Sequence, residues 1–299
     1  MSQGPVLPPA VNFHMWKPCN LRCKFCYAVF DDDASLRAVR TGLGEADARR
    51  IVDLLRPAGA EKITFVGGEP TLCPHLPAML RQARDMGYIT TLVTNGKRLR
   101  HVLDAAPGCV DWVGLSVDSA DERVQAELGR GTGDHVARSI ELFHHLHDLC
   151  IRVKLNTVVT ALNWQEDMTA FVREARPERW KVFQVLPIEG QNTGLVDTLL
   201  ITAEQFGSFV DRHRVVSTHG ITVAAESNED MTGSYAMIDP LGRFFSNVGG
   251  RYVYSPPILE VGVAAAFSAV AFDPGRFDAR GGRYDWGSTR VSLTMSARS

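Results

Sequence analysis

The sequence lacks the features that would assign it to a membrane, secreted or nucleic-acid-binding class. Residues 1–10 are proline-rich, with no basic start and no long apolar run, so they do not resemble a signal peptide. No stretch approaches the roughly 18 apolar residues that a membrane helix needs. The formal net charge is −2 and 22% of the residues are charged, which gives no sign of a nucleic-acid or membrane-surface partner. We therefore expect a cytoplasmic protein.

Cysteine is also scarce, with six in 299 residues, but Cys19, Cys23 and Cys26 lie within one short segment. Disulfides are rare in the cytosol, where a close group of cysteines instead indicates a metal or redox site. The other three are scattered, and free cysteine is often simply buried. We expect these three to be core residues: Cys73, Cys109 and Cys150.

Strand-like and helix-like segments alternate from residue 11 to about residue 225. Strands are expected over residues 11–16, 62–66, 88–94, 112–117, 151–159, 180–186 and 221–225. Helices are expected over residues 45–55, 75–86, 99–106, 135–149, 165–175 and 203–213. This alternation predicts an α/β fold with βα units around a parallel sheet, open or closed into a barrel. Thr202 and Gln205 predict a capping box, and Asp134 is expected to cap the helix that follows it.

The alternation ends after residue 226, which predicts a C-terminal extension packed over the core. Residues 234–239 and 243–246 are predicted to form a hairpin around a Pro-Leu-Gly turn. A short alanine-rich helix within residues 259–272 and a tail rich in Gly, Arg and Asp follow, and the last ten or so residues are expected to be mobile. The expected organisation is a short flexible N-terminus (1–10), one α/β domain (11–225) and the extension (226–299).

The three close cysteines follow the first expected strand, so they lie in a loop at its C-terminal end. Parallel α/β folds place their ligands at that end. Three thiolates suit an iron–sulfur cluster or zinc. A structural zinc site needs four ligands, and His14 is the nearby side chain that could be the fourth. A four-iron cluster held by three cysteines would instead leave one iron open for a small chelating molecule.

The CxxxCxxC spacing, with Phe25 before the third cysteine and Tyr27 after it, resembles the signature of the radical S-adenosylmethionine (SAM) superfamily. A second element, Gly67-Gly68-Glu69-Pro70, follows the second strand, and its glycines allow backbone to approach a ligand closely. It resembles the GGEP element that holds the SAM amino group, although alone it is a common tight βα connection. Asn95 and Ser116 end the next two strands, where they either contact SAM or only cap helices.

Several expected strands carry cations on faces that would normally be apolar in a buried parallel sheet. The residues that share a strand face are Arg152, Lys154 and Asn156; Arg179 and Lys181; and Lys62, Thr64 and Val66. Any single cation could be solvated or paired at a strand end. An unpaired buried cation is costly, however, and several on different strands favour an anion inside the barrel, with a polyphosphate as the obvious candidate. There is no Walker-type glycine loop, so side chains would bind it.

Ordered matches from about Asn12 to Trp286 resemble the family of viperin and its prokaryotic viperin-like relatives. The matching stretches include residues 12–14, 128–131, 154–159, 179–184, 188–190, 226–228 and 234–235. The resemblance implies a partial (βα)6 barrel with SAM and a [4Fe–4S] cluster as cofactors. It also implies a nucleoside triphosphate substrate, with CTP expected first and UTP or GTP as alternatives. The implied product is the 3′-deoxy-3′,4′-didehydro nucleotide, an antiviral chain terminator.

The resemblance also implies roles for individual residues. The cluster would be held by Cys19, Cys23 and Cys26. SAM would be contacted by Tyr27, Gly67, Gly68, Glu69, Asn95, Ser116 and Arg130. The nucleotide would be contacted by Asn12, Lys62, Lys154, Asn156, Arg179 and Lys181. Tyr235 would lie near the sugar as a candidate hydrogen donor, unless it is an ordinary core residue. A flavodoxin or ferredoxin system would supply electrons, and no nucleic acid or membrane partner is expected.

The sequence departs from the family pattern at two places, and two alternative functions remain open. Val66 stands where animal relatives carry serine, which would alter a SAM contact, and the tail beyond Trp286 does not match. One alternative is a radical SAM enzyme with another substrate, such as a peptide. Those enzymes often carry further C-terminal cysteine clusters, whereas no cysteine follows Cys150. The other is a metal-binding protein without catalysis. The sequence leaves the preferred base, the reductant and the oligomeric state open.

Overall fold

The computed structural model describes residues 7–287, and an α/β fold fills this range. The strands are β1 (Ala10–Trp16), β2 (Lys62–Gly67), β3 (Ile89–Thr94), β4 (Trp112–Ser116), β5 (Arg152–Val159), β6 (Arg179–Gln184), β7 (Thr222–Glu226), β8 (Ala236–Ile238), β9 (Arg243–Ser246) and β10 (Val253–Pro257). The helices are α1 (Ala34–Ala38), α2 (Glu45–Leu55), α3 (Leu76–Asp85), α4 (Leu99–Ala105), α5 (Glu122–Glu127), α6 (His135–Asp148), α7 (Thr169–Ala175), α8 (Ala203–His213), α9 (Asn228–Met231), α10 (Ile258–Val261), α11 (Val263–Ser268) and α12 (Pro274–Ala279). Short 3₁₀ helices cover Pro70–Leu72, Asp197–Leu199 and Arg214–His219.

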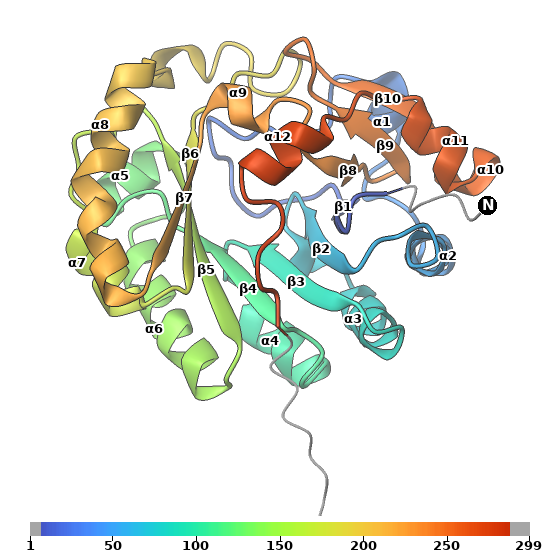
Figure 1. Ribbon diagram of the computed structural model, residues 1–299, viewed down its shortest axis with the longest axis horizontal. Helices are drawn as coiled ribbons and strands as arrows, with labels where there is room; N and C mark the ends of the chain where they lie inside the picture. The colour runs from blue at the N-terminus through green and yellow to red at the C-terminus, as the bar shows by residue number, and fades with distance from the viewer. Residues whose placement is uncertain (1–6, 288–299) are drawn as a thin grey trace, which may run out of the picture.

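All ten strands belong to one sheet, in the order β10-β9-β8-β1-β2-β3-β4-β5-β6-β7. Strands β1 to β7 are parallel, β8 adds to β1 in parallel, and β9 and β10 are antiparallel. Figure 1 shows the sheet curving, with the crossover helices on its outer side. Because β7 and β10 are the two edges, the barrel stays open. The predicted partial barrel of parallel strands is confirmed.

The two faces of β1 show how the barrel is built. Val11, Phe13 and Met15 pack into the hydrophobic core between the sheet and the outer helices. The alternate residues Asn12 and His14 line a cavity on the inner side. Successive side chains of a strand point to opposite faces, so one strand serves both the core and the cavity.

The seven predicted parallel strands all form, with boundaries that differ by at most two residues. The predicted helix over residues 165–175 begins only at Thr169 as α7, because Glu166 lies in a preceding turn and accepts a hydrogen bond from the Ala120 amide (2.7 Å). The capping box of Thr202 and Gln205 on α8 is confirmed.

The predicted cap on α6 was wrong. The carboxylate of Asp134 accepts no hydrogen bond from the helix backbone and pairs instead with Arg138. Glu122, from α5, accepts the amides of His135 (2.9 Å) and Val136 (2.7 Å). A residue distant in sequence therefore satisfies the orphan donors that begin this helix.

The C-terminal part continues the sheet. The predicted hairpin forms as β8 and β9, and β10 extends it. The expected alanine-rich helix is two short helices, α10 and α11, because Gly262 between them has a positive φ of 83°. At the other end, Leu7 is buried and its amide bonds the carbonyl of Ala58 (3.0 Å). Residues 1–6 of the N-terminus that was predicted to be flexible (1–10), and the last ten or so residues that were predicted to be mobile, lie outside the described residues.

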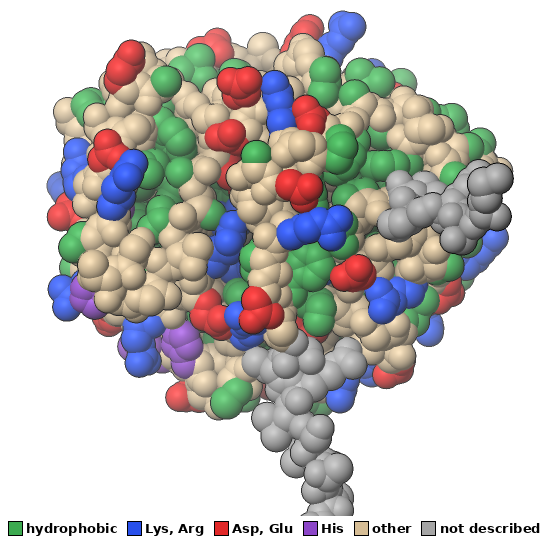
Figure 2. Space-filling view, in the orientation of Figure 1, with side chains coloured by type: hydrophobic (Ala, Val, Ile, Leu, Met, Phe, Trp, Pro, Cys, Tyr) green, Lys and Arg blue, Asp and Glu red, His purple; other side chains and the backbone are tan. Residues whose placement is uncertain are grey.

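Two of the scattered cysteines, Cys73 and Cys109, are buried as expected, but Cys150 is exposed, which corrects that prediction. Cys150 has a positive φ of 54° in the turn between α6 and β5. Acidic and basic side chains are interspersed on the face shown in Figure 2, as the small net charge indicates. Across residues 7–287, none of the helices combines the length and the apolar composition that a membrane crossing needs.

Candidate active site

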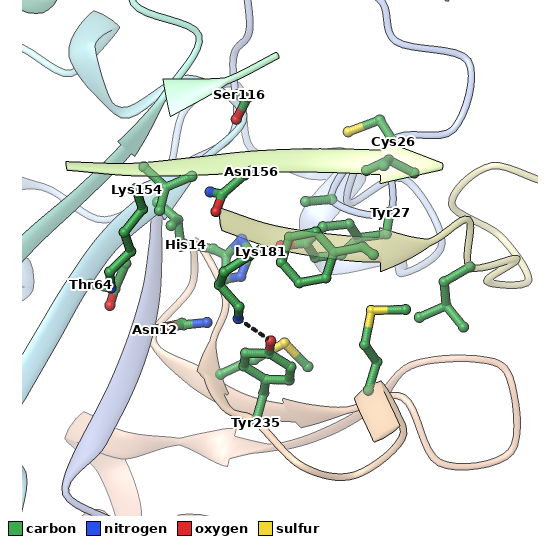
Figure 3. Close-up of a pocket in the computed structure, with 18 of the residues that line it drawn as sticks. Asn12, His14, Cys26, Tyr27, Thr64, Ser116, Lys154, Asn156, Lys181 and Tyr235 are labelled. Carbon is green, nitrogen blue, oxygen red and sulfur yellow. Dashed lines mark hydrogen bonds between the residues drawn. The ribbon is translucent and has the colours of Figure 1, made fainter. Parts of the chain in front are cut away.

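A cavity of about 290 Å³ lies inside the barrel, and every site residue predicted from the sequence lines it. Its walls come from the inner faces of the strands, and Figure 3 shows several of these side chains. One end carries the cysteines, and we call it the cysteine end. The other end is lined by Lys62, Lys154 and Tyr284, and we call it the cation end.

Backbone contacts fix the loop that carries the cysteines. The amides of Arg22 and Lys24 bond the carbonyls of Gly129 (3.2 Å) and Leu128 (3.0 Å). Gly129 has a φ of 84°, and a Cβ there would lie 2.1 Å from the Arg22 carbonyl oxygen. Glycine is therefore required at this position for the cysteine loop to dock.

The three thiols are free and partly buried. Burial raises the pKa of Cys23 to about 12, and the nearby Arg130 opposes this shift. Within residues 7–287, no three His, Cys, Asp or Glu side chains converge on a point that one metal ion could occupy. A single zinc ion needs four converging ligands, whereas a multi-iron cluster binds each thiolate through a different iron. The donor set and its spacing therefore fit an iron–sulfur cluster better than the zinc alternative with His14.

The glycines of the GGEP element lie against the cysteine loop. A Cβ on Gly67 would be 2.3 Å from the carbonyl oxygen of Trp16, and one on Gly68 would be 2.1 Å from that of Lys17. The amide of Gly68 bonds the Trp16 carbonyl (2.6 Å), and the amide of Glu69 bonds that of Pro18 (2.9 Å). The two elements that the sequence separates by about forty residues thus form one unit at the cysteine end.

Glu69 is buried, with 1% of its surface exposed. Its Oε1 accepts from the amide of Thr71 (3.1 Å) and the hydroxyls of Thr71 and Thr94 (both 2.6 Å), while Oε2 accepts from the Asn95 amide (2.9 Å). Burial raises the pKa of Glu69, and these donors oppose the shift. Each carboxylate oxygen has about two acceptor positions, and Oε2 accepts one bond from the described residues, so it keeps one position for an ammonium group of a ligand.

The other residues predicted to contact SAM lie around this end. The Asn95 side chain donates to Asn20 in the cysteine loop (2.8 Å). Arg130 is buried, pairs with Asp118 and lies over the ring of Phe25 (5.4 Å). Tyr27 and Ser116 also line the cavity. The residues predicted to contact SAM therefore all line the cavity.

The cation end gathers charges from several strands. The cations that line it are Lys62 on β2, Lys154 on β5, Arg179 and Lys181 on β6, and Arg280 after α12. Burial, with their mutual repulsion, lowers the pKa of Lys62 to about 7 and holds the pKa of Lys154 well below its ordinary value. Burial also lowers the pKa of Lys181 to about 8, although Glu226 opposes that shift. Several cations facing one cavity are an arrangement of charge that suits a polyanion.

Arg152 differs from its strand neighbour Lys154. The sequence placed both on one face of β5, but Arg152 stacks over Trp112 (4.1 Å) and pairs with Glu178 (2.7 Å) outside the cavity. Asn156, next on that face, lines the cavity, and Gly114 makes room for its amide group (3.0 Å from a Cβ built there). Asn12 lines the same region from β1 (Figure 3).

Tyr284 closes the cation end and was missed by the sequence reasoning. Its hydroxyl accepts hydrogen bonds from Lys62 (2.7 Å) and Lys154, and its ring lies under Arg179 (4.6 Å). Figure 1 shows the segment after α12 running across the barrel toward β4, where the indole of Trp112 bonds the Trp286 carbonyl (3.0 Å). The sequence signal that could have identified this segment is the pair Gly281-Gly282. A Cβ on Gly281 would lie 2.8 Å from Arg179, so glycine allows the segment to approach the cations.

The hydroxyl of Tyr235 lies in a charged network, while its ring packs against a hydrophobic cluster. Its hydroxyl donates to the buried carboxylate of Glu226 and accepts from Lys181 (2.7 Å), as Figure 3 shows for the second bond. The guanidinium of Arg280 lies 3.5 Å from the ring centroid. Burial raises the pKa of Tyr235 well above its ordinary value, so the hydroxyl keeps its proton. Glu226 and Arg280 are functional-site neighbours that the sequence reasoning did not assign.

Most of the chain is similar in sequence to proteins whose family is known. Residues 16–172 match the family model of the radical SAM superfamily. The chain is 44% identical over 282 residues to an S-adenosylmethionine-dependent nucleotide dehydratase of Flammeovirga pacifica, covering 93% of this chain and 96% of that protein. It is 42% identical over 287 residues to one of Lacinutrix mariniflava, covering 94% of this chain but only 60% of that longer protein.

A solved structure of SuiB from Streptococcus suis, bound to its precursor peptide SuiA, has a similar fold. Its TM-score is 0.71 at 17% sequence identity, and the match covers 94% of this chain and 68% of SuiB. At that identity the likeness concerns the fold, and it agrees with the partial barrel described above.

Proposed function

Because the chain belongs to the radical SAM superfamily and, within it, to the S-adenosylmethionine-dependent nucleotide dehydratases, we propose that it converts a nucleoside triphosphate to its 3′-deoxy-3′,4′-didehydro analogue. As a member of this family it is an enzyme, and its cofactors are SAM and a [4Fe–4S] cluster. CTP is the proposed substrate, with UTP and GTP as alternatives. The product lacks a 3′-hydroxyl, so it would end a growing RNA chain, and we propose an antiviral role.

This proposal depends on one observation, which is that thiols and cations line opposite ends of the same cavity. Three thiols line the cysteine end, and five cations line the cation end (Lys62, Lys154, Arg179, Lys181 and Arg280). Among the described residues, Glu226 is the carboxylate that pairs with cations at that end. The uncompensated positive charge favours a triphosphate, and a nucleotide that bound its phosphates there would extend its sugar toward the cysteines.

In this proposal, each residue has a defined task. When bound, the reduced cluster and SAM supply the radical chemistry that removes the ribose 4′ hydrogen. Cys19, Cys23 and Cys26 hold the cluster. The Gly67-Gly68-Glu69 turn, with Tyr27, Asn95, Ser116 and Arg130, orients SAM. The triphosphate is held by Lys62, Lys154, Arg179 and Lys181, with Asn12 and Asn156 nearby.

The proposed dehydration removes the ribose 4′ hydrogen and the 3′ hydroxyl, which leaves as water and requires one further electron and one proton. Tyr235 holds a hydroxyl proton at this part of the cavity, between Lys181 and Glu226. We propose it as the hydrogen donor, and the tyrosyl radical left behind would be reduced by the electron donor and reprotonated by solvent before the next turnover. A flavodoxin or ferredoxin system would supply the electrons to the cluster.

The proposed division of the chain follows from where these residues lie. Residues 11–225 form the barrel that carries the thiols and most cations. The extension from residue 226 contributes Tyr235, Arg280 and Tyr284 to the cavity, and we propose that it covers the active site. The cysteines of the described chain are unpaired, which fits the reducing cytoplasm proposed for it.

The test is anaerobic reconstitution of the full chain with iron and sulfide, followed by turnover with SAM and a chemical reductant. CTP, UTP and GTP are supplied in competition, and mass spectrometry measures 5′-deoxyadenosine and each dehydrated nucleotide. We expect one nucleotide to accelerate 5′-deoxyadenosine formation and to lose the mass of water. A reconstituted enzyme that forms 5′-deoxyadenosine at the same rate with and without every nucleotide would favour another substrate, such as a peptide.

A further inference from the structure

Three polar side chains that line the cavity have a buried atom with no hydrogen-bond partner. They are His14 on β1, Thr91 on β3 and Asn156 on β5. His14 is the most extreme, because it is 1% exposed and both of its ring nitrogens lack a partner. Leaving a buried polar group unpaired costs free energy, so a ligand that pairs it would recover that cost.

The surroundings of His14 offer it no partner within the protein. Its ring meets the edges of Phe30 and Phe245 (5.4 Å between centroids in each case) and of Tyr27 (6.0 Å). Burial lowers the pKa of His14 to about 3, so the imidazole is neutral and presents one donor and one acceptor. The aromatic neighbours therefore hold the ring in place without using either nitrogen.

The ladder between β1 and β2 shows at which level of the cavity His14 lies. Lys62 of the cation end pairs with Ala10, and Gly67 of the cysteine end pairs with Trp16. His14 pairs with Val66, between these two rows. It lies four residues beyond the Lys62 row, which is about 13 Å along a strand.

A nucleotide that binds its phosphates at the cation end places its sugar next, toward the cysteines. We propose that the neutral imidazole of His14 hydrogen-bonds a ribose hydroxyl of this nucleotide and so orients the sugar. The inference rests on the proposed function, and it adds a substrate contact that the charges alone do not require. The other unpartnered atoms are on Thr91 of β3 and Asn156 of β5, which are separated from β1 by one and by three strands.

The test uses the reconstituted holoenzyme with SAM and without reductant, so that nucleotide binds but does not react. Calorimetry measures the affinity for CTP, 2′-deoxy-CTP and 3′-deoxy-CTP. His14→Phe keeps an aromatic ring against Phe30 and Phe245 but removes both nitrogens. His14→Gln restores a donor and an acceptor. The matched control is His213→Phe, because His213 is equally buried but has both nitrogens paired (2.8 Å to the Met168 amide and 2.7 Å to the Phe209 carbonyl).

We expect wild type to bind CTP more tightly than one of the two deoxynucleotides. His14→Phe should weaken CTP binding about tenfold and abolish that preference. His14→Gln should recover part of the preference, and SAM affinity should not change. His213→Phe should lower thermal stability while keeping the preference.

Several outcomes would overturn the inference. One is a preference between CTP and its deoxy forms that survives in both His14 variants. Another is a loss confined to SAM affinity, which would make His14 a cofactor contact. If His14→Phe does not fold, the preference is measured in His14→Leu, which also removes both nitrogens. A wild-type enzyme that binds no nucleoside triphosphate would reject the proposed function itself, whereas intact binding with unchanged discrimination rejects only the role of His14.

Discussion

The two ends of the cavity are built in different ways. The cysteine end consists of two short contiguous segments, the cysteine loop and the GGEP turn, which contact each other through backbone atoms. The cation end consists of single side chains from β2, β5 and β6 and from the segment after α12. Backbone contacts hold the cysteine end in place, whereas the positions of the side chains at the cation end depend on the overall fold.

Because the two ends are built differently, a substitution at one end should not impair the function of the other. A side-chain change at the cation end leaves the backbone contacts of the cysteine loop intact. A change of one thiol leaves the cation row on its strands. Variants at either end therefore test whether cluster binding and nucleotide binding are separable.

The largest effect is expected for Cys23→Ser at the cysteine end. Removing one of three thiolates should abolish the cluster, so iron content and SAM cleavage should fall to background. Nucleotide affinity should stay within about twofold, since the charged hydrogen bonds at the other end remain. Iron analysis and calorimetry measure the two effects. Cys150→Ser is the control, because Cys150 is exposed and outside the cavity. Full iron content in Cys23→Ser would break the assignment of the cluster.

The next effect is expected for Lys154→Met at the cation end. Losing one charged donor to phosphate should weaken nucleotide binding by about 10- to 100-fold. The absorbance of the cluster should be unchanged. Arg173→Met, on the exposed face of α7, is the matched loss of a cation outside the cavity. Equal affinities in the two variants would mean that the cation end does not bind phosphate.

The pH dependence of nucleotide binding should distinguish the two ends further. Burial lowers the pKa of Lys62 to about 7 and that of Lys181 to about 8 in the nucleotide-free protein. A bound phosphate favours the charged amines and raises these pKa values. Above the nucleotide-free pKa, binding must therefore take up protons, and affinity should fall about tenfold per pH unit for each proton as pH rises from 7.5 to 9.

Calorimetry at pH 8.5 in two buffers of different ionisation heat measures this proton uptake. The charged or titratable groups that face Lys62 are Lys154, Arg179, Lys181, Arg280 and Tyr284. SAM affinity should vary less over the same range, because none of these lysines lies at the cysteine end. Nucleotide affinity that is independent of pH, with no proton uptake, would contradict the lowered pKa values.

The smallest effect is expected for Tyr284→Phe. The variant keeps the ring against Trp112 (5.8 Å between centroids) but removes the hydroxyl that accepts from Lys62 and Lys154. In the variant, a nucleotide does not have to break the hydrogen bonds from the two lysines to this hydroxyl. Calorimetry should therefore show CTP binding about threefold tighter. Weaker binding would mean that the hydroxyl itself contacts the nucleotide and belongs to the substrate site.

Much of the cysteine end could be predicted from the sequence because its residues are contiguous. The cysteine spacing and the GGEP turn each show their chemistry within a few residues. The alternating strand pattern also placed Lys62, Lys154 and Lys181 on faces that turn out to line the cavity. Period-two alternation is a local property, so it can be read without the fold.

The rest depends on contacts between distant parts of the chain. Alternation predicted the same environment for Arg152 and Lys154, but Trp112 and Glu178 draw Arg152 out of the cavity. Asp134 had a capping sequence, yet Glu122 from another helix bonds the first amides of α6. Tyr284 and Arg280 carried no motif of their own, and only the path of the extension brings them to the cations.

The contact between Lys62 and Tyr284 joins residues 222 positions apart in the chain. During synthesis, the strands that carry the cations leave the ribosome long before the segment that covers them. Contacts of such long sequence separation form late and slow folding, because their loop-closure entropy is lost before the contact forms. The lysines of the nascent barrel therefore remain in contact with water until the segment that carries Tyr284 docks. The cation end of the active site forms only at that late step.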